Sequence, residues 1–332
     1  MLINTPSSKT HLLYIASFLA QLKGKFDIQK IYIRPSGQFL NFKGLLDQDI
    51  TDFFGADWSY LKENSRLSFR FFFNKKKKNK TLYYLHISDC TIQSILCSDF
   101  VSQYKEIRNV IICEGIGSSG NLLTRFLVAL REQKKFNIFI FIRKIITKGI
   151  LSIFFKKVFL KVEQWQLYNQ NLELNPEIKQ YILVHNHYYQ SLEQSEQKAI
   201  LFIGQPWVEL GFVEQNTYIN FLQSIIDGLI KKGYYIKLRP HPAEGLDKYE
   251  KLNIQLDQDY SLPLELLFDQ PYIVIGNCST ALINLSAIFG VDAYLLKCDF
   301  LENLYLSKTQ KALFAKYCGS ELDLEQLLDK LH

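Results

Sequence analysis

Hydrophobic and polar positions follow their most regular pattern in the C-terminal half of the chain. Short runs rich in β-branched and aromatic residues, such as 199–203 (AILFI), alternate there with longer segments in which apolar residues recur every three or four positions. The short runs predict strands at 199–203, 234–239, 271–275 and 292–296, and the longer segments predict helices at about 216–231, 261–269 and 279–289. Because strands that alternate with helices form parallel sheets, this half is predicted to be an α/β domain.

The N-terminal half shows a weaker form of the same alternation. Apolar spacing predicts a helix over 10–22, and strands are predicted at 28–34, 67–73, 81–87 and 108–113. Around residues 184–197 the apolar periodicity fades and polar residues gather before the next strand. We therefore predict an N-terminal α/β domain of residues 1–192 and a C-terminal domain of residues 193–332, which ends in an amphipathic helix at 321–331.

Length and composition agree with two folded domains. A chain of 332 residues exceeds the usual size for a single hydrophobic core, and a hydrophobic content of 48% is ample for two cores. The 39 basic and 33 acidic residues give a net charge of +6. This excess is too small to predict nucleic acid as a partner, although it permits attraction to anionic ligands or lipids.

The chain has the features expected of a cytoplasmic protein. Its N-terminus lacks the basic and apolar pattern of a signal peptide, and five basic residues interrupt the most apolar candidate for a membrane span, 136–160. That segment fits either a partly buried strand and helix or a helix that lies on an anionic membrane surface. The six cysteines form no CxxC pair and no cluster with the six histidines, so reduced thiols and no metal site are expected.

Two polar segments follow predicted strands of the C-terminal domain, at the sheet edge where ligands of parallel α/β sheets bind. In the first, Arg239-Pro240-His241-Pro242, two prolines fix the backbone and present an imidazole beside a guanidinium. One interpretation is a ligand site and the other is only a tight turn.

The second polar segment, which contains Asn277, Ser279 and Thr280, opens the helix predicted at 279–289. Free backbone N–H groups, the positive end of the helix dipole and two hydroxyls can bind one phosphate without a metal, although the hydroxyls also fit a simple helix cap. Both segments are expected at the same end of one sheet, and this coincidence favours a shared phosphate site.

A third segment, 113–121, follows the strand predicted at 108–113 in the N-terminal domain. Glu114 ends that strand, where its carboxylate could take a proton from an acceptor hydroxyl across an interdomain cleft. The glycines beside it would let a substrate approach closely. The run 115–120 (GIGSSG) lacks the setting of a dinucleotide-binding fingerprint at the first βα turn of its domain, and it is not followed by the Lys and Ser or Thr of a phosphate-binding P-loop. The predicted acceptor-side loop consists of Gly115, Gly117, Ser118 and Asn121.

Taken together, the pairs Glu114-Gly115, His241-Pro242 and Ser279-Thr280 resemble the motifs of the bacterial sialyltransferase and polysialyltransferase group. The segment Phe202–Pro206, with Glu209, looks like the opening of the donor domain in those enzymes. The resemblance covers about residues 105–290. It implies a GT-B fold, in which two Rossmann-like domains with parallel sheets face each other across a cleft, and a CMP-activated nonulosonic acid as donor, with no metal or cofactor.

The resemblance also implies roles for single residues. Glu114 would be the general base on the acceptor hydroxyl, and His241 would contact, and could protonate, the departing CMP phosphate. Ser279 and Thr280 would bind that phosphate, with Asn277 and Pro242 in the same two loops. We add Arg239 as a candidate partner for the donor phosphate or carboxylate.

The sequence departs from the family pattern before the glycine of the third segment. Relatives often carry two acidic residues there, whereas this chain has Cys113 before Glu114. Asp89, after another predicted strand, is therefore a reserve candidate for the base.

The expected function is transfer of a nonulosonic acid to an oligosaccharide or lipid-linked glycan acceptor in capsule or lipopolysaccharide synthesis. Such an acceptor would bring the protein into peripheral contact with the inner membrane. Two alternatives stay open. One is a CDP-polyol phosphotransferase of the teichoic-acid kind, whose motifs are also similar, and the other is a non-catalytic protein that binds a nucleotide sugar.

Overall fold

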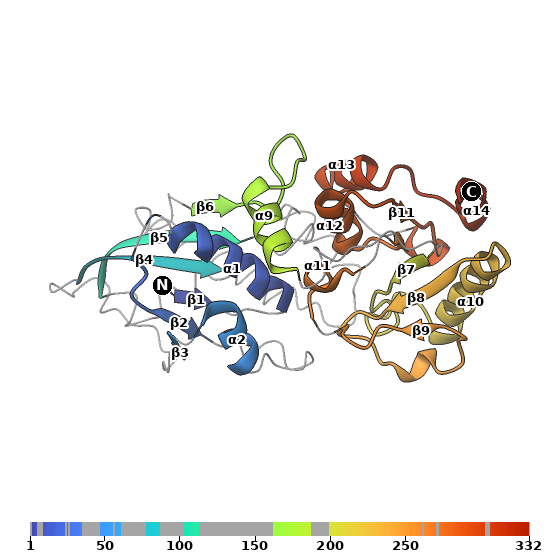
Figure 1. Ribbon diagram of the computed structural model, residues 1–332, viewed down its shortest axis with the longest axis horizontal. Coiled ribbons are helices and arrows are strands. Elements are labelled where there is room, and N and C mark those ends of the chain that lie inside the picture. Colours follow the sequence, from blue (N-terminus) through green and yellow to red (C-terminus); the bar gives the residue numbers. More distant parts are fainter. Residues whose placement is uncertain are drawn as a thin grey trace, which may run out of the picture. The chain divides into compact units, whose positions relative to one another are not determined.

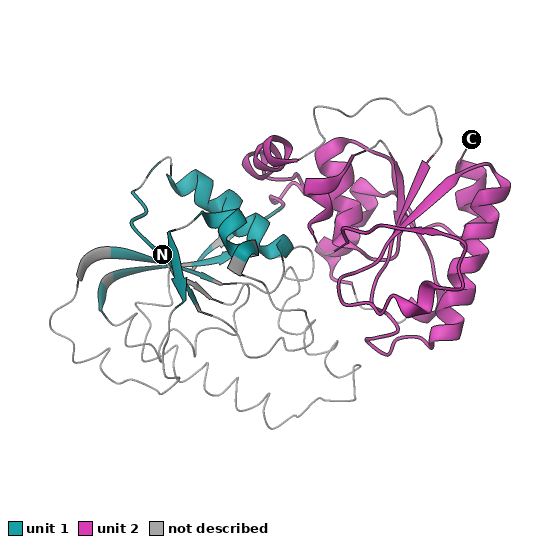
Figure 2. Ribbon diagram, turned by 60° about the horizontal axis from the view of Figure 1, so that its bottom comes forward, with its two compact units in different colours: residues 1–167 teal, residues 168–332 magenta. Residues whose placement is uncertain are grey.

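The chain folds as two α/β units, each built on its own parallel sheet and drawn in its own colour in Figure 2. The units comprise residues 1–167 and 168–332. The computed structural model describes residues 2–4, 9–23, 25, 27–34, 47–55, 57–60, 78–86, 103–112, 162–186, 199–260, 262–269, 272–302 and 306–331. The prediction of two α/β units with parallel sheets is confirmed.

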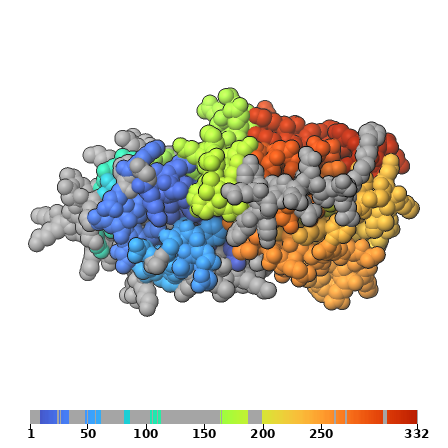
Figure 3. Space-filling view, in the orientation of Figure 1, coloured from blue at the N-terminus to red at the C-terminus, as the bar shows by residue number. Residues whose placement is uncertain are grey.

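The division between the units falls before the predicted one at 192/193, because the segment that follows Leu167 packs in unit 2. Helix α9 (Pro176–His185) lies against α11 (Leu264–Leu267) and α12 (Thr280–Phe289). The space-filling view shows α9, in light green, beside the orange and red residues of unit 2 (Figure 3). At the end of α9, the amide of Asn186 donates to the carbonyl oxygens of Glu265 at 2.9 Å and Phe268 at 3.2 Å.

Unit 1 contains a parallel sheet to which the described residues contribute six strands, in the order β3-β2-β1-β4-β5-β6 (Figure 1). The strands are β1 (Leu2–Asn4), β2 (Ile31–Arg34), β3 (Trp58–Tyr60), β4 (Lys78–His86), β5 (Tyr104–Ile112) and β6 (Val162–Trp165). Its two described helices are α1 (Lys9–Lys23) and α2 (Asp47–Phe54). This order is the doubly wound Rossmann arrangement, in which the chain changes direction between the first and fourth strands.

The predicted elements of unit 1 are found where the structure describes the chain. The helix predicted at 10–22 is α1, and the strands predicted at 28–34, 81–87 and 108–113 correspond to β2, β4 and β5. The strand predicted at 67–73 lies outside the described residues, as does the basic and aromatic segment 136–160.

Unit 2 contains a second parallel sheet, with five described strands in the order β11-β10-β7-β8-β9. The strands are β7 (Ala199–Ile203), β8 (Tyr235–Arg239), β9 (Gln255–Leu256), β10 (Ile273–Gly276) and β11 (Ala293–Leu295). The other elements of this unit are α10 (Gln215–Lys231), η4 (Asp247–Tyr249), η5 (Asp299–Leu301), α13 (Lys308–Tyr317) and α14 (Leu324–Lys330). In chain order this is again a Rossmann arrangement, and here the change of direction lies between β7 and β10.

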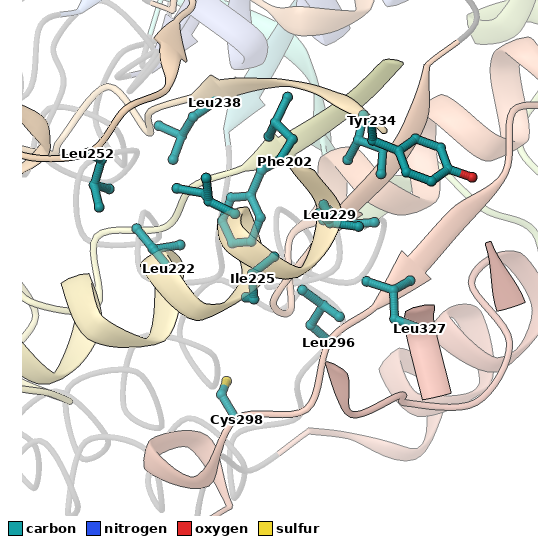
Figure 4. Close-up of a cluster of buried hydrophobic side chains, with 14 of the residues drawn as sticks. Phe202, Leu222, Ile225, Leu229, Tyr234, Leu238, Leu252, Leu296, Cys298 and Leu327 are labelled. Carbon is teal, nitrogen blue, oxygen red and sulfur yellow. The ribbon is translucent and has the colours of Figure 1, made fainter. Parts of the chain in front are cut away.

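The core of unit 2 explains the pattern of its sequence. All five residues of β7 are buried, because helices cover both faces of this central strand. Phe202 and Leu238 pack on one face against Leu222, Ile225 and Leu229 of α10, in the cluster of Figure 4. A strand that is buried on both faces is apolar throughout rather than alternating, as the run 199–203 is.

Candidate functional site

The backbone is closely packed where β7 and β10 end at the change of direction in unit 2. A Cβ atom on Gly276 would lie 2.9 Å from the carbonyl oxygen of Ile203, and one on Gly204 would lie 3.2 Å from the carbonyl oxygen of Arg239. The N–H of Gly204 donates to that Arg239 oxygen at 2.8 Å. A side chain at Gly276 would clash with this backbone and one at Gly204 would crowd it, so glycine allows the ends of β10, β7 and β8 to lie close together at this edge.

His241 lies in the turn that follows β8, with its ring held by the backbone. The N–H of Ala243 donates to Nδ1 of His241 at 3.1 Å, so the neutral ring carries its proton on Nε2. Burial lowers the pKa of His241 to about 4, the Glu209 carboxylate opposes this shift, and the Lys248 ammonium adds to it. The imidazole is therefore neutral near pH 7, and it can donate one hydrogen bond through Nε2.

A buried charged network supports the His241 turn. Lys248 donates to Glu244 at 2.7 Å and to both oxygens of Glu209 at 3.0 and 3.2 Å. The Lys248 ammonium also lies 5.1 Å from the ring centres of Tyr218 and Tyr249. Burial raises the pKa of Glu244, while its hydrogen bonds to Lys248 and Tyr249 oppose that shift. Before the structure, Glu209 was singled out only through the family resemblance. Glu244 and Lys248 were not singled out, although their i, i+4 spacing was a signal for an ion pair.

The turn after β10 is built by backbone geometry. Cys278 has a φ of 49°, a left-handed conformation that is uncommon for a residue with a side chain. Ser279 then caps α12, and its Oγ accepts from the N–H of Ala281 at 3.3 Å. The cap interpretation is thus confirmed for Ser279. It leaves the hydroxyl hydrogen of Ser279 able to donate, and it places Thr280 as the first residue of the ten-residue helix α12.

Two residues that were predicted to bind the ligand, Asn277 and Arg239, make hydrogen bonds within the protein. The amide of Asn277 donates to the carbonyl oxygen of Leu296 at 2.9 Å and to Sγ of Cys298 at 3.3 Å, which joins the turn to the end of β11. The guanidinium of Arg239 is buried and donates to the carboxylate of Asp257 and to two backbone carbonyl oxygens in the segment after β9. Their positions support a structural role for both side chains.

His241 and Ser279 leave the same edge of the sheet, from strands that are not neighbours. β7 lies between β8 and β10, so the loops flank the end of β7 instead of standing side by side. Neighbouring strands are about 4.8 Å apart, so the strand ends that carry the two loops are separated by roughly 10 Å. A phosphate over the end of β7 would lie between the two loops.

The predicted acceptor-side residues lie outside the described part of the chain. They are Glu114, Gly115, Gly117, Ser118, Asn121 and the reserve base Asp89. Their roles stay predictions.

Neither metal binding nor a membrane span is indicated in the part of the chain that the structure describes. In that part, no group of three or more His, Cys, Asp or Glu side chains could hold a metal ion. Among the helices formed by the same residues, none is both long and apolar enough to cross a bilayer.

Comparison with known proteins relates the chain to one family. Residues 70–297 match the family model of alpha-2,8-polysialyltransferase (POLYST). No curated protein matches the sequence.

Two solved structures can be superposed on nearly the whole chain. The heptosyltransferase WaaC of E. coli, solved with ADP, is 11% identical, with a TM-score of 0.41 over 99% of this chain and 96% of that chain. The glycotransferase of kitacinnamycin is 7% identical, with a TM-score of 0.45 over 99% of this chain and 87% of that chain. Both TM-scores are below 0.5, so the description of the fold stands on the sheet topology above.

Proposed function

The chain belongs to the alpha-2,8-polysialyltransferase family, and we propose that it transfers a nonulosonic acid from a CMP-activated donor to a glycan acceptor. Members of this family are glycosyltransferases, and the chain is one. The observation that carries the donor assignment is the edge of unit 2 where β7, β8 and β10 end, with a neutral imidazole on one side and a helix N-terminus with two hydroxyls on the other. Such an edge is where Rossmann-like units bind nucleotides.

In this proposal the CMP phosphate binds over the end of β7. The first N–H groups of α12 and the hydroxyls of Ser279 and Thr280 donate to its oxygens, and the helix dipole favours its negative charge. From the other side, Nε2–H of His241 donates to the oxygen that gains charge as the sugar leaves. A preorganised donor of this kind stabilises the transition state more than the ground state.

His241 acts in this proposal as a hydrogen-bond donor and not as an acid that loses its proton. The contact between Ala243 N–H and Nδ1 keeps the ring neutral, and a neutral imidazole is a very weak acid. The departing phosphate does not require a proton at neutral pH, since the second pKa of a phosphate monoester is about 6. This interpretation replaces protonation of CMP by His241 as the proposed role.

The transfer step then needs one base. The acceptor hydroxyl oxygen forms a bond to the anomeric carbon while the bond from that carbon to the CMP phosphate oxygen breaks, and its electron pair stays with CMP. We assign Glu114 to take the proton from the acceptor hydroxyl, on the family motif that it shares, with Asp89 in reserve. Glu114→Gln should abolish transfer while CMP still binds, and unchanged transfer would remove Glu114 from this role.

The donor can be identified directly. We expect CMP to raise the melting temperature of the protein more than CDP, UDP or GDP, because a ligand that binds the native state stabilises it. Incubation with CMP-sialic acid should release CMP, whereas CDP-glycerol should not be consumed. Consumption of CDP-glycerol alone would identify a polyol phosphotransferase, and CMP binding without turnover of any CMP-sugar would identify a non-catalytic binding protein.

We also propose that the acceptor is a lipid-linked glycan of capsule or lipopolysaccharide at the cytoplasmic side of the inner membrane. The support is the basic and aromatic composition of residues 136–160. The protein should float with vesicles that contain phosphatidylglycerol and should remain behind with purely zwitterionic vesicles. Failure to float with either would argue against peripheral contact through lipid charge.

A further inference from the structure

One buried carboxylate joins the His241 turn of unit 2 to the segment that follows it. The side chain of Glu244 has no solvent exposure. Its Oε2 accepts from the backbone N–H of His241 at 2.6 Å, and its Oε1 accepts from Lys248 at 2.7 Å and from the Tyr249 hydroxyl at 2.5 Å. This carboxylate therefore links the turn after β8 with the short helix η4.

Two hydrogen bonds between His241 and Glu244 close the turn. The N–H of Glu244 donates to the carbonyl oxygen of His241 at 2.9 Å, while the Glu244 carboxylate accepts from the N–H of His241. Ala243, whose N–H holds Nδ1 of the imidazole, lies inside this closed turn. The hydrogen bonds of Glu244 therefore fix the direction of the Ala243 N–H. That direction in turn determines which ring nitrogen of His241 carries the proton.

The end of β7 is shaped to receive the same carboxylate. A Cβ atom on Gly204 would lie 2.6 Å from Oε2 of Glu244, so any larger residue would displace it. On the far side of Lys248, Glu209 accepts from the N–H of Gly245 at 2.9 Å. The loop after β7 and the turn after β8 are thus fixed to each other through Glu244, Lys248 and Glu209.

We propose that Glu244 is a positioning residue that holds His241 in the tautomer with Nε2–H directed to the ligand phosphate. Lys248 balances its charge, because a buried carboxylate without a partner would be strongly disfavoured. Loss of the Glu244 carboxylate frees the N–H of His241 and loosens the turn that directs the Ala243 N–H to Nδ1, so the imidazole can then rotate or move its proton to Nδ1. The inference deepens the proposed role of His241, and its activity readout rests on that proposed function.

The decisive experiment measures the imidazole itself. Protein labelled with ¹⁵N in histidine, with His241→Gln to assign the signal, reports which ring nitrogen of His241 carries the proton. In the wild type we expect the Nε2–H tautomer, and we expect the ring to stay neutral from pH 8 to pH 5. In Glu244→Ala we expect a mixture of tautomers and a titration midpoint closer to the ordinary histidine value of about 6.5.

The groups that face His241 must be separated in this titration. Glu209 and Lys248 act on its pKa in opposite directions, and Glu244 binds its backbone. Glu244→Gln removes the charge but keeps an oxygen acceptor for the His241 N–H, so it should restore most of the single tautomer. Glu250→Gln is the matched control, because it neutralises an exposed carboxylate beside the same short helix and should leave the His241 signal unchanged.

Activity gives a second readout with CMP-sialic acid as the probe. Glu244→Ala should lower kcat by about 10- to 100-fold through misplacement of His241, with a change in donor KM of less than about threefold.

If folded Glu244→Ala keeps the wild-type tautomer and titration of His241, the proposal is wrong. If Glu244→Ala does not fold, Tyr249→Phe, which removes one bond to the same carboxylate, must shift the His241 signal or the proposal fails. The tautomer is measured without substrate. A wild-type protein that turns over no CMP-sugar would therefore refute the proposed function, while the measured role of Glu244 in fixing the tautomer would remain valid.

Discussion

The two turns that flank the end of β7 use different means to hold their polar side chains. The His241 turn depends on side-chain charges, with Glu244 and Lys248 buried beneath it. The turn after β10 depends on the backbone, through the left-handed Cys278 and the helix cap at Ser279. The thiol of Cys278 in that turn stays neutral, because burial raises the pKa of Cys278 to about 12.

In the proposed function, this difference gives the two turns separate tasks at one phosphate. Backbone N–H groups and a helix dipole provide a fixed, weakly pH-dependent attraction for an anion. A charged network instead fixes one imidazole in one protonation state, and it is sensitive to single substitutions because a buried charge that loses its partner is costly. We therefore expect the His241 side to determine the rate and the Ser279 side to contribute mainly to binding and stability.

The largest expected effect is a loss of stability, and it tests the ion pair of Arg239 and Asp257 at the end of β8. Arg239→Gln should lower the free energy of unfolding by about 3–5 kcal/mol, because it leaves the largely buried Asp257 without its main cation. Denaturant unfolding measures this loss, and Asp257→Asn should also destabilise the protein, since it leaves the buried guanidinium of Arg239 without its carboxylate partner. CMP affinity of the folded fraction should be unchanged. A loss of CMP affinity without a loss of stability would restore Arg239 as a ligand of the donor.

The next effect is on catalysis. His241→Ala should lower kcat by roughly 10²–10³-fold, the usual effect of removing one preorganised donor from a developing negative charge. Steady-state release of CMP from CMP-sialic acid measures it. The melting temperature at pH 7.5 should change little. A fall in kcat of less than about threefold in the folded variant would exclude His241 from the transition state.

The same side chain should make stability depend on pH. Burial holds the pKa of His241 at about 4, below its unfolded value of about 6.5, so the unfolded chain binds a proton that the folded chain does not between these pH values. Stability is therefore fully present above pH 6.5 and falls as pH decreases towards 4, by about 3 kcal/mol for this group.

His11, in unit 1, contributes in the same direction, since burial lowers its pKa to about 3. Unfolding free energies of wild type and His241→Ala between pH 7 and pH 4 separate the two, because the variant keeps the His11 contribution. The variant should lose less stability over this interval. Parallel curves would mean that the imidazole of His241 has the same pKa in the folded and unfolded states.

The comparison of the two turns also shows where sequence reasoning succeeds. The helix α12 was predicted closely because Ser279 at its start and Gly290 at its end are both strong local signals. Helix α13 was not predicted, although Ser307 and Gln310 form a capping box that signals its start. The two-residue strand β9 has no signal of its own, since it exists through pairing with β8.

The His241 turn was predicted as a loop, and its supports were not. The role of Arg239 depends on where β9 brings Asp257, a long-range pairing that local pattern does not encode. Glu244 and Lys248 are spaced as a helical ion pair, but they act through a turn and a short 3-10 helix. Buried charges of this kind are specified by the tertiary fold, which is why the sequence pointed to His241 as a candidate and missed the side chains that hold it.

The smallest expected effect tests whether Ser279 is more than a cap. Ser279→Ala removes the side-chain acceptor of the Ala281 N–H and should cost about 1 kcal/mol of stability, the usual effect of losing a serine cap. Ser307→Ala is the matched control, because Ser307 caps α13 through the N–H of Gln310 at 3.2 Å and lies outside the proposed site. Thermal unfolding should show similar losses for the two variants.

The two cap variants should differ in their affinity for CMP. If the Ser279 hydroxyl donates to the phosphate, Ser279→Ala weakens CMP binding by roughly 5- to 10-fold, which corresponds to a net hydrogen bond of about 1 kcal/mol, while Ser307→Ala leaves it unchanged. Calorimetric titration with CMP measures both. Equal CMP affinities would reduce Ser279 to its capping role, and the phosphate would then depend on the backbone N–H groups of α12 and on His241. That outcome would preserve the contrast between the two turns, since the β10 side would act through its backbone alone.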